Sequence, residues 1–366
     1  LINNTYYQGL GAGTITGYHR NDFYQKSWSY SVFGQGTLNI TDNFRAIGSL
    51  RYSETKKKGS FTSRLVSGVR LNPESVAHGK FTEDYLDPSA TLQFDATPDV
   101  MFYATAARGS KSGGFVSNTS GTTDATFQFR PERSTNYEVG MKSSFLDGRL
   151  VANVAAFHMK FKDLQQSTYD PDRRTFFTRN AAKASSEGVE VDVQWLPVDS
   201  LQISLGLAYL DAKFDDYPGA PCLTRETLAQ CNSADPASLA AHNLKGVPLQ
   251  FAPKWSGNVG ARHTLILPND WRLVTNVAAS FRSKYFIADG YDPIWGRQDG
   301  WVKLDARVQL GPADNRWDVA LVGRNLTDER TAAAAIRFPG SITSVSRAIF
   351  WMDEYRSVAI EGTYRF

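Results

Sequence analysis

Residues 301–310 read W-V-K-L-D-A-R-V-Q-L, and from Val302 onward apolar and polar side chains alternate without interruption. The apolar set recurs at every second position: Val302, Leu304, Ala306, Val308 and Leu310. The polar set fills the positions between them: Lys303, Asp305, Arg307 and Gln309. This period of two predicts a β-strand with two chemically different faces. Such a strand fits a soluble sandwich, where the apolar face meets a core. It also fits a membrane barrel, where the apolar face meets lipid and the polar face lines the lumen.

The spacing of the turns favours the barrel. Short polar turns occur at residues 41–43, 97–99, 146–148, 197–199, 268–270 and 311–315. Much longer polar segments separate them, at residues 54–84, 110–134, 165–186, 215–254, 285–299 and 326–356. Short connections at one end and long ones at the other are typical of outer-membrane barrels. A soluble sandwich would not sort its connections so regularly.

The turns define hairpins over residues 31–53, 86–109, 136–163, 187–214, 255–284 and 300–325, with a closing strand over 357–366. A further strand over 6–18 brings the expected total to about fourteen. Each strand has about 9–13 residues, near the length that a tilted strand needs to cross a bilayer. We therefore predict an all-β fold, a transmembrane antiparallel β-barrel with short periplasmic turns and long extracellular loops. Asn325 and Asp328 are expected to shape the exit of one strand into its loop.

Large aromatic residues flank the short turns: Phe44, Phe94, Phe145, Trp195, Trp271, Trp317 and Phe366. A second aromatic level follows roughly 8–10 residues further along the strands, at Tyr52, Tyr209 and Phe281, as expected for two interfacial girdles around an apolar band of about 25 Å. A sandwich core would instead concentrate its bulk mid-strand, where this chain often has Ala, Gly and Val. Basic side chains facing lipid would cost about 2–4 kcal/mol each, so the lumen is expected to receive four of them: Lys142, Arg262, Lys303 and Arg307.

Composition and charge exclude several other classes of protein. The 40 basic and 37 acidic residues give a net charge of +3, and no basic cluster exceeds residues 56–58, which argues against a nucleic-acid partner. No run of 18 apolar residues offers a transmembrane helix.

Catalytic and metal-binding signatures are weak. Residues 53–56 match S-x-x-K without its partner motifs, and residues 9–13 lack the context of a dinucleotide loop. The five histidines show no ligand spacing. We therefore expect no enzyme, no metal site and no cofactor. Cys222 and Cys231 lie in the longest loop, where a disulfide is the simplest expectation for an exported protein; two thiolates alone would be an incomplete zinc site.

Several stretches resemble the TonB-dependent outer-membrane receptors. They are residues 31–58, Y-A-T-A-A-R-G-S-K-S-G-G-F (103–115), 131–150, S-E-G-V-E-V-D-V (186–193), G-R-N-L-T-D-E-R (323–330) and the terminal Tyr364-Arg365-Phe366. The resemblance implies a 22-stranded barrel closed by an N-terminal plug. Relative to that pattern the plug and about eight strands are missing. We therefore expect residues 1–366 to be the C-terminal portion of the barrel, with no plug domain in this chain.

This resemblance also implies a function: active uptake of a scarce ligand, by default a ferric siderophore, across the bacterial outer membrane. The implied partners are the TonB complex acting through the missing plug, outer-membrane lipid and lipopolysaccharide, and the barrel-assembly machinery acting through the strand that ends at Phe366. Two alternatives stay open. One is a passive, porin-like channel, and the other is a soluble β-sandwich binding module.

The topology places a group of cations and aromatics on the outer side. They are Arg108, Lys111, Arg130, Arg133, Tyr169, Arg173, Arg174, Phe176, Phe177 and Arg179. Guanidinium groups pair well with carboxylate or catecholate oxygens, so this set is the candidate binding surface for an anionic ferric chelate. The alternative for any single cation is a contact with lipopolysaccharide phosphate or with solvent.

Overall fold

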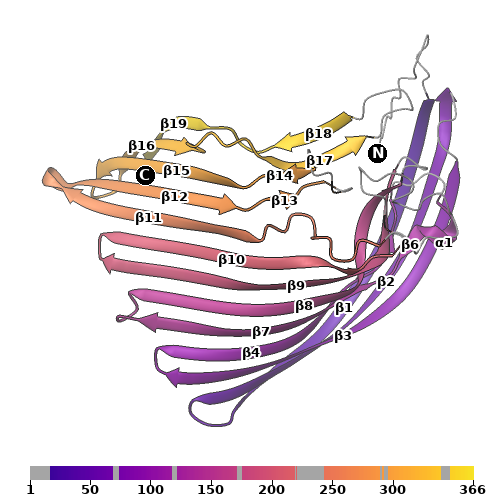
Figure 1. Cartoon of the computed structure of the whole chain (residues 1–366), viewed down its shortest axis with the longest axis horizontal. Helices are drawn as coiled ribbons and strands as arrows, with labels where there is room; N and C mark the ends of the chain where they lie inside the picture. The colour runs from indigo at the N-terminus through magenta and orange to yellow at the C-terminus, as the bar shows by residue number, and fades with distance from the viewer. Residues whose placement is uncertain are drawn as a thin grey trace.

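The computed structural model describes residues 17–68, 74–117, 122–170, 175–218, 220, 243–288, 291, 296–338 and 347–366. One large antiparallel sheet dominates it (Figure 1). Its thirteen strands are β1 (Gly17–Asn39), β2 (Phe44–Gly68), β3 (Ser75–Thr97), β4 (Val100–Lys111), β7 (Glu132–Phe145), β8 (Leu150–Asp170), β9 (Thr175–Val198), β10 (Leu201–Asp216), β11 (Trp255–Leu267), β12 (Trp271–Arg282), β15 (Trp301–Pro312), β16 (Trp317–Arg324) and β19 (Ser357–Tyr364). They follow one another in chain order, which confirms the predicted barrel-type meander.

Small elements occupy the connections. They are β5 (Gly114–Phe115), α1 (Asp124–Phe127), β6 (Gln128–Phe129), η1 (Pro268–Asp270), β13 (Tyr285–Phe286), β14 (Arg297–Gln298), β17 (Ala332–Phe338) and β18 (Arg347–Met352). The strand pairs β5–β6, β13–β14 and β17–β18 form small separate sheets. No helix in the described residues is long and apolar enough to cross a membrane.

The short turns all lie at one end of the sheet, called here the turn end, and the opposite end is called the loop end (Figure 1). Left-handed backbone closes several of these turns, at Leu146 and Asp147, at Asp270 and at Asn315. Polar residues with short side chains adopt this conformation at lower cost than most others, which explains the Asp and Asn in these turns.

Several strands are longer than the sequence predicts. The sequence predicts a loop over residues 54–84, but β2 has 25 residues and β3 has 23, so most of that segment is paired strand. The same holds for residues 165–186, which extend β8 and β9. β1 begins at Gly17, and residues 6–16 of the further predicted strand lie outside the described residues. Turn-forming composition in these stretches was outweighed by continuous cross-strand hydrogen bonding.

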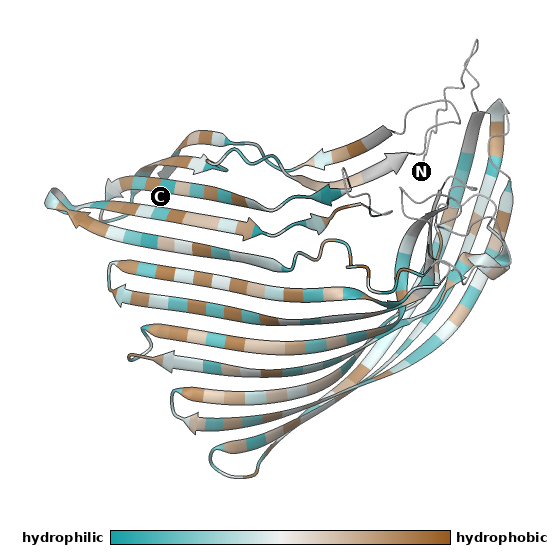
Figure 2. Ribbon diagram, in the orientation of Figure 1, coloured by the Kyte–Doolittle hydropathy of each residue, from teal (hydrophilic) through white to brown (hydrophobic). Residues whose placement is uncertain are grey.

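The apolar face of the sheet is not covered by protein. Trp195, Leu205 and Val302 are 40%, 38% and 50% exposed, although all three belong to the apolar phase of their strands. Within the described residues, the only other sheets are the three small pairs, and none forms a second layer. Figure 2 shows hydrophobic and hydrophilic residues alternating along the strands. The soluble sandwich is therefore wrong, because a sandwich would bury this face.

Charged residues lie on the opposite, polar face, as predicted. Arg307 forms an ion pair with Glu361, and Lys303 Nζ lies 3.3 Å from Asp353 Oδ2. Lys142 lies over the ring of Tyr103, 5.9 Å from its centroid. Arg262 pairs in register with polar positions on both sides: Gln202 on β10 and Asn276 on β12.

The aromatics beside the short turns share the apolar face. Phe44, Phe94 and Phe102 are directly opposite one another on β2, β3 and β4, and the rings of Trp271 and Trp317 meet edge to face at 5.5 Å. At the other level, the rings of Tyr209 and Trp255 are 5.0 Å apart. Their contact with the membrane interface stays a prediction.

Val259 and Asn258 provide a matched test of which face meets lipid. Val259 is 48% exposed on the apolar face, and Asn258 is its neighbour on the polar face at the same depth. We expect Val259→Arg to lower the free energy of unfolding in liposomes by about 2–4 kcal/mol, and Asn258→Arg to change it little. Denaturant titration of the refolded barrel followed by tryptophan fluorescence measures both. Equal losses would contradict a lipid-facing Val259.

Candidate functional site

The segment between β4 and β7 folds back over the polar face at the loop end. Phe115 lies directly on a pair of glycines, Gly59 of β2 and Gly79 of β3, which are partners in register. A Cβ at Gly79 would lie 2.4 Å from Phe115 Cε1, and one at Gly59 would lie 2.7 Å from Cδ2. Phe115 also stacks on Phe127 of α1, with centroids 4.7 Å apart. The glycines therefore form a socket that only the absence of a side chain leaves open.

Around this socket lies an aromatic cluster. Its buried members are Phe61, Ala77, Phe115 and Phe127, with Phe81 packed against them. Phe61, Ala77 and Phe127 are fully buried. This packing of residues 112–117 and 122–131, the described parts of the 112–131 segment, against β2 and β3 supplies a local hydrophobic core at the loop end.

A polar latch holds the same segment. Lys57 Nζ donates to Ser112 Oγ at 2.6 Å and to Gly113 O at 2.5 Å. Glu83 Oε2 accepts from Gly113 N at 3.1 Å and also from the hydroxyl of Tyr85. Burial lowers the pKa of Lys57, and the nearby charge of Glu83 partly opposes that shift. In this latch, Lys57 of β2 and Glu83 of β3, which carry opposite charges, both bind the backbone of Gly113.

A second clamp comes from β8 and β9. Gln165 Nε2 donates to Ser112 O at 3.0 Å and to Arg130 O at 3.1 Å. Asn180 Oδ1 accepts from Arg130 N at 2.6 Å, and its Nδ2 donates to Arg130 O at 2.7 Å and to Asp163 O at 2.8 Å. A β-bulge between Phe161 and Gln165 shifts the register here, which re-aims these side chains toward the segment. Both ends of the segment are thus fixed.

Two of the predicted ligand residues meet at this clamp. Arg130 Nη2 donates to Asp163 Oδ1 at 2.7 Å, with its side chain 70% exposed. Lys111 lies on the polar face opposite Glu132, with Nζ 3.8 Å from the carboxylate. Gln165 connects Lys111 and Arg130 indirectly. Its side chain donates to Arg130 O, and its backbone N donates at 2.9 Å to Oε2 of Glu132, the carboxylate beside Lys111. The geometry therefore brings Lys111 and Arg130 to one surface.

Arg108 and Arg133 lie on the other face. Arg108 is opposite Thr135, and Arg133 is opposite Ser110, in the phase of the exposed Tyr137. A strand turns its side chains to opposite faces at successive residues, so Arg108 and Lys111 diverge although only three positions apart.

The remaining predicted residues are placed only in part. The backbones of Tyr169, Phe176, Phe177 and Arg179 belong to the β8–β9 hairpin, where Tyr169 is opposite Phe176. Their side chains, and Arg173 and Arg174 entirely, lie outside the described residues, as do Cys222 and Cys231. In the ranges that the structure describes, no three His, Cys, Asp or Glu side chains gather into a metal-binding group.

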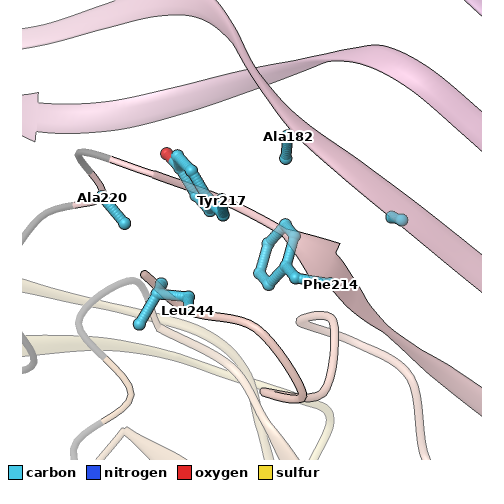
Figure 3. Packing of buried hydrophobic residues seen from close by; sticks show 6 residues of the cluster. Ala182, Phe214, Tyr217, Ala220 and Leu244 are labelled. Carbon is cyan, nitrogen blue, oxygen red and sulfur yellow. The ribbon is translucent and has the colours of Figure 1, made fainter. Parts of the chain in front are cut away.

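Further apolar clusters lie at the loop end. One joins Phe214 and Tyr217, whose rings are 5.0 Å apart, to Leu244, Ala182, Ala184 and Ala220 (Figure 3). Asn243 fastens the return of this segment, because its Oδ1 accepts from Tyr217 N at 2.8 Å and its Nδ2 donates to Asp216 at 2.7 Å. Another cluster contains Tyr285, Ile287, Ala288, Ala332 and Ala335. These buried contacts hold the bases of the long connections.

Asn325 shapes the exit from β16, as predicted. Its backbone is left-handed, its Nδ2 donates to Glu329 O at 2.9 Å, and its Oδ1 accepts from Glu329 N at 3.0 Å. Asp328 is left-handed too and donates its backbone N to Asn325 O.

Sequence reasoning missed most of this site. The sequence patterns predict no role for four of its residues: Lys57, Glu83, Gln165 and Asn180. The pairing of Gly59 with Gly79 cannot be predicted from local sequence, because it depends on the register between β2 and β3.

A single curved sheet with an uncovered apolar face, a charged polar face and short turns at one end defines a membrane-spanning β-barrel wall. The chain matches the family described as TonB dependent receptor-like, beta-barrel, over residues 2–326, and it belongs to that family. It is therefore an outer-membrane protein, with the turn end periplasmic and the loop end extracellular.

Two curated relatives give the scale of the likeness. The chain is 31% identical over 179 residues to the metal-pseudopaline receptor CntO of Pseudomonas aeruginosa, a match that covers 49% of this chain and 23% of the relative. It is 28% identical over 172 residues to the pesticin receptor of Yersinia pestis, covering 47% and 24%. The matches thus span about a quarter of each relative.

Solved structures show the same fold. The ferric yersiniabactin uptake receptor FyuA of Yersinia pestis superposes with a TM-score of 0.74 at 19% identity, covering 94% of this chain and 46% of that one. The siderophore receptor PiuA of Acinetobacter baumannii gives 0.65 at 18%, covering 93% and 43%. In both, the chain covers less than half of the larger receptor.

Proposed function

We propose that this chain forms part of the barrel wall of an outer-membrane receptor that captures a metal chelate, with a ferric siderophore as the first candidate, and imports it. The observation that carries the proposal is the 112–131 segment, which two clamps and an aromatic socket hold against the polar face at the extracellular end. Relatives named as receptors for metal–pseudopaline and for ferric yersiniabactin uptake support the class of cargo.

The cations nearest the clamp suit an anionic chelate. Lys111 and Arg130 lie at the extracellular end of the polar face, and the exposed guanidinium of Arg130 can offer paired N–H donors to carboxylate or catecholate oxygens. The other predicted members of the hairpin, from Tyr169 to Arg179, complete the proposed surface. Arg108 and Arg133, on the outward face, fit the headgroups of surrounding lipid or lipopolysaccharide instead.

Transport of this kind requires no covalent chemistry and no resident cofactor. Members of this family are transport receptors, and the roles proposed for the residues here are binding and positioning. Energy would be relayed from the inner membrane by the TonB complex through a plug in the larger receptor.

Assembly would use the closing strand. β19 ends the sheet, and its apolar face is bare, with Val358, Ile360 and Tyr364 65%, 78% and 64% exposed. We propose that the barrel-assembly machinery recognises and binds this strand and its terminal Phe366.

Uptake of a radiolabelled ferric chelate tests the transport function in cells that carry the whole receptor as their sole route. We expect the double variant Gln165→Ala and Asn180→Ala to raise the apparent KM at least about tenfold, because several hydrogen bonds that hold the segment are lost. Gln202→Ala is the matched control, since this polar-face amide donates to Gln194 Oε1 at 3.2 Å and, in the part of the chain that the structure describes, forms no hydrogen bond with the 112–131 segment. Wild-type uptake that persists without the TonB complex, with size-graded leakage of sugars from liposomes, would favour a passive channel.

A further inference from the structure

Three lysines stand in one row across three neighbouring strands. Lys26 of β1 is directly opposite Lys58 of β2, and Lys58 is directly opposite Lys80 of β3. All three are exposed, and all lie on the outward face, in the phase of Trp28 and Tyr52. Like charges in directly opposed positions destabilise a sheet, so the row is unfavourable unless an anion neutralises it.

The protein itself does not supply that anion in the described residues. None of the three ammonium groups forms an ion pair there, and Lys26 Nζ lies instead over the ring of Trp28 at 4.3 Å. The neighbouring acids are engaged or distant from the row. Glu54 pairs with Lys56 at 2.8 Å.

The balance of charge around the row is positive. The outward positions of these three strand extensions carry six cations, Arg20, Lys26, Lys56, Lys58, Arg64 and Lys80, against three acids, Asp22, Glu54 and Asp84. Asp22 already contacts Arg20 at 2.9 Å and Arg64 at 3.7 Å. Lysines often protect an exposed sheet edge, and this accounts for Lys26 on the edge strand β1 and for Lys80, which lies beyond the residues of β3 that pair with β4. Lys58 is paired on both sides, with Lys26 and with Lys80. Edge protection therefore does not explain Lys58 or the alignment of all three lysines.

The height of the row is that of lipid headgroups. Trp28 is opposite Lys56, so the row lies two residues, about 7 Å along the strand, beyond an exposed tryptophan. Tyr30 and Tyr52 follow toward the membrane centre, 55% and 40% exposed. Aromatic side chains of this kind mark the boundary between hydrocarbon and headgroups. The row is therefore on the headgroup side of the extracellular boundary.

We propose that Lys26, Lys58 and Lys80 bind the phosphorylated headgroup of a lipopolysaccharide molecule in the outer leaflet. A polyvalent phosphate headgroup can neutralise several ammonium groups at once, while its acyl chains lie on the apolar face below. The inference rests on the outer-membrane setting of the proposed function and is independent of the imported cargo.

Lipopolysaccharide titration of the purified whole receptor tests the site. Thermal unfolding is followed as lipopolysaccharide, its dephosphorylated form or inorganic phosphate is added. For the wild type we expect stabilisation by phosphorylated lipopolysaccharide alone. For the triple variant K26Q/K58Q/K80Q we expect the affinity for lipopolysaccharide to fall at least about tenfold. Without lipid, the triple variant should unfold at a higher temperature than the wild type, because the repulsion within the row is gone.

A triple variant at other exposed lysines, K183Q/K245Q/K254Q, removes the same charge elsewhere and should bind like the wild type. The proposal is overturned if K26Q/K58Q/K80Q binds as tightly as the wild type, if dephosphorylated lipid works equally well, or if inorganic phosphate alone stabilises to the same extent. Uptake of the ferric chelate, measured in parallel, separates the two proposals. If the wild-type receptor does not import the chelate, the transport function is rejected, whereas the proposed lipopolysaccharide site is unaffected.

Discussion

Replacement of Asp318 by alanine is expected to lower the free energy of unfolding by about 3 kcal/mol. The Asp318 side chain is 2% exposed, with Arg365 Nη1 at 3.0 Å and Arg307 Nη2 at 4.0 Å. Arg307 in turn pairs with Glu361 on β19. The carboxylate thus ties β15, β16 and the chain terminus together. The loss falls at the low end of the range for breaking a buried pair, because the two arginines remain 29% and 51% exposed and are partly screened by water.

Asp314→Ala is the control for this prediction. Asp314 pairs with Arg316 at 3.3 Å, but the two side chains are 54% and 77% exposed, so about 0–1 kcal/mol is expected. Unfolding of the detergent-refolded barrel by guanidinium chloride measures the free energy of unfolding of both variants. Equal and small losses would show that the Asp318 network adds no more than a surface ion pair.

The second large effect is expected from Gly79→Val. A Cβ at this position would lie 2.4 Å from Phe115 Cε1, and the ring has little room to retreat between Gly59 and Phe127. Phe115 should therefore leave its socket and release the 112–131 segment. Limited proteolysis of whole cells should cleave this segment at least about tenfold faster than in the wild type, because cleavage follows local opening.

Gly48→Val is the matched control, since nothing lies within 4 Å of a Cβ at Gly48 of the same strand pair. Phe115→Ala supplies a second check. If Gly79→Val acts through the ring, adding it to Phe115→Ala should change the cleavage rate no further. Additive effects would mean that valine disturbs β3 itself.

Much of the fold could be predicted from local sequence because a strand has a period of two. Val302 and Lys303 fall on opposite faces in the structure, as their alternation requires. Parity along a strand also explains why the predicted ligand set divides. Arg108 and Lys111 were grouped by their position in the chain, but they face opposite sides of β4.

The sequence by itself determined the strand order, the turn end and the chemical character of the two faces, since each depends on residues within a few positions of one another. The tertiary structure decided how far β2, β3, β8 and β9 extend and which connection folds inward. It also decided that Gly59 meets Gly79 beneath Phe115 and that Lys26, Lys58 and Lys80 align. These features depend on cross-strand register, which joins residues about twenty or more positions apart and is set by the packing of the whole sheet.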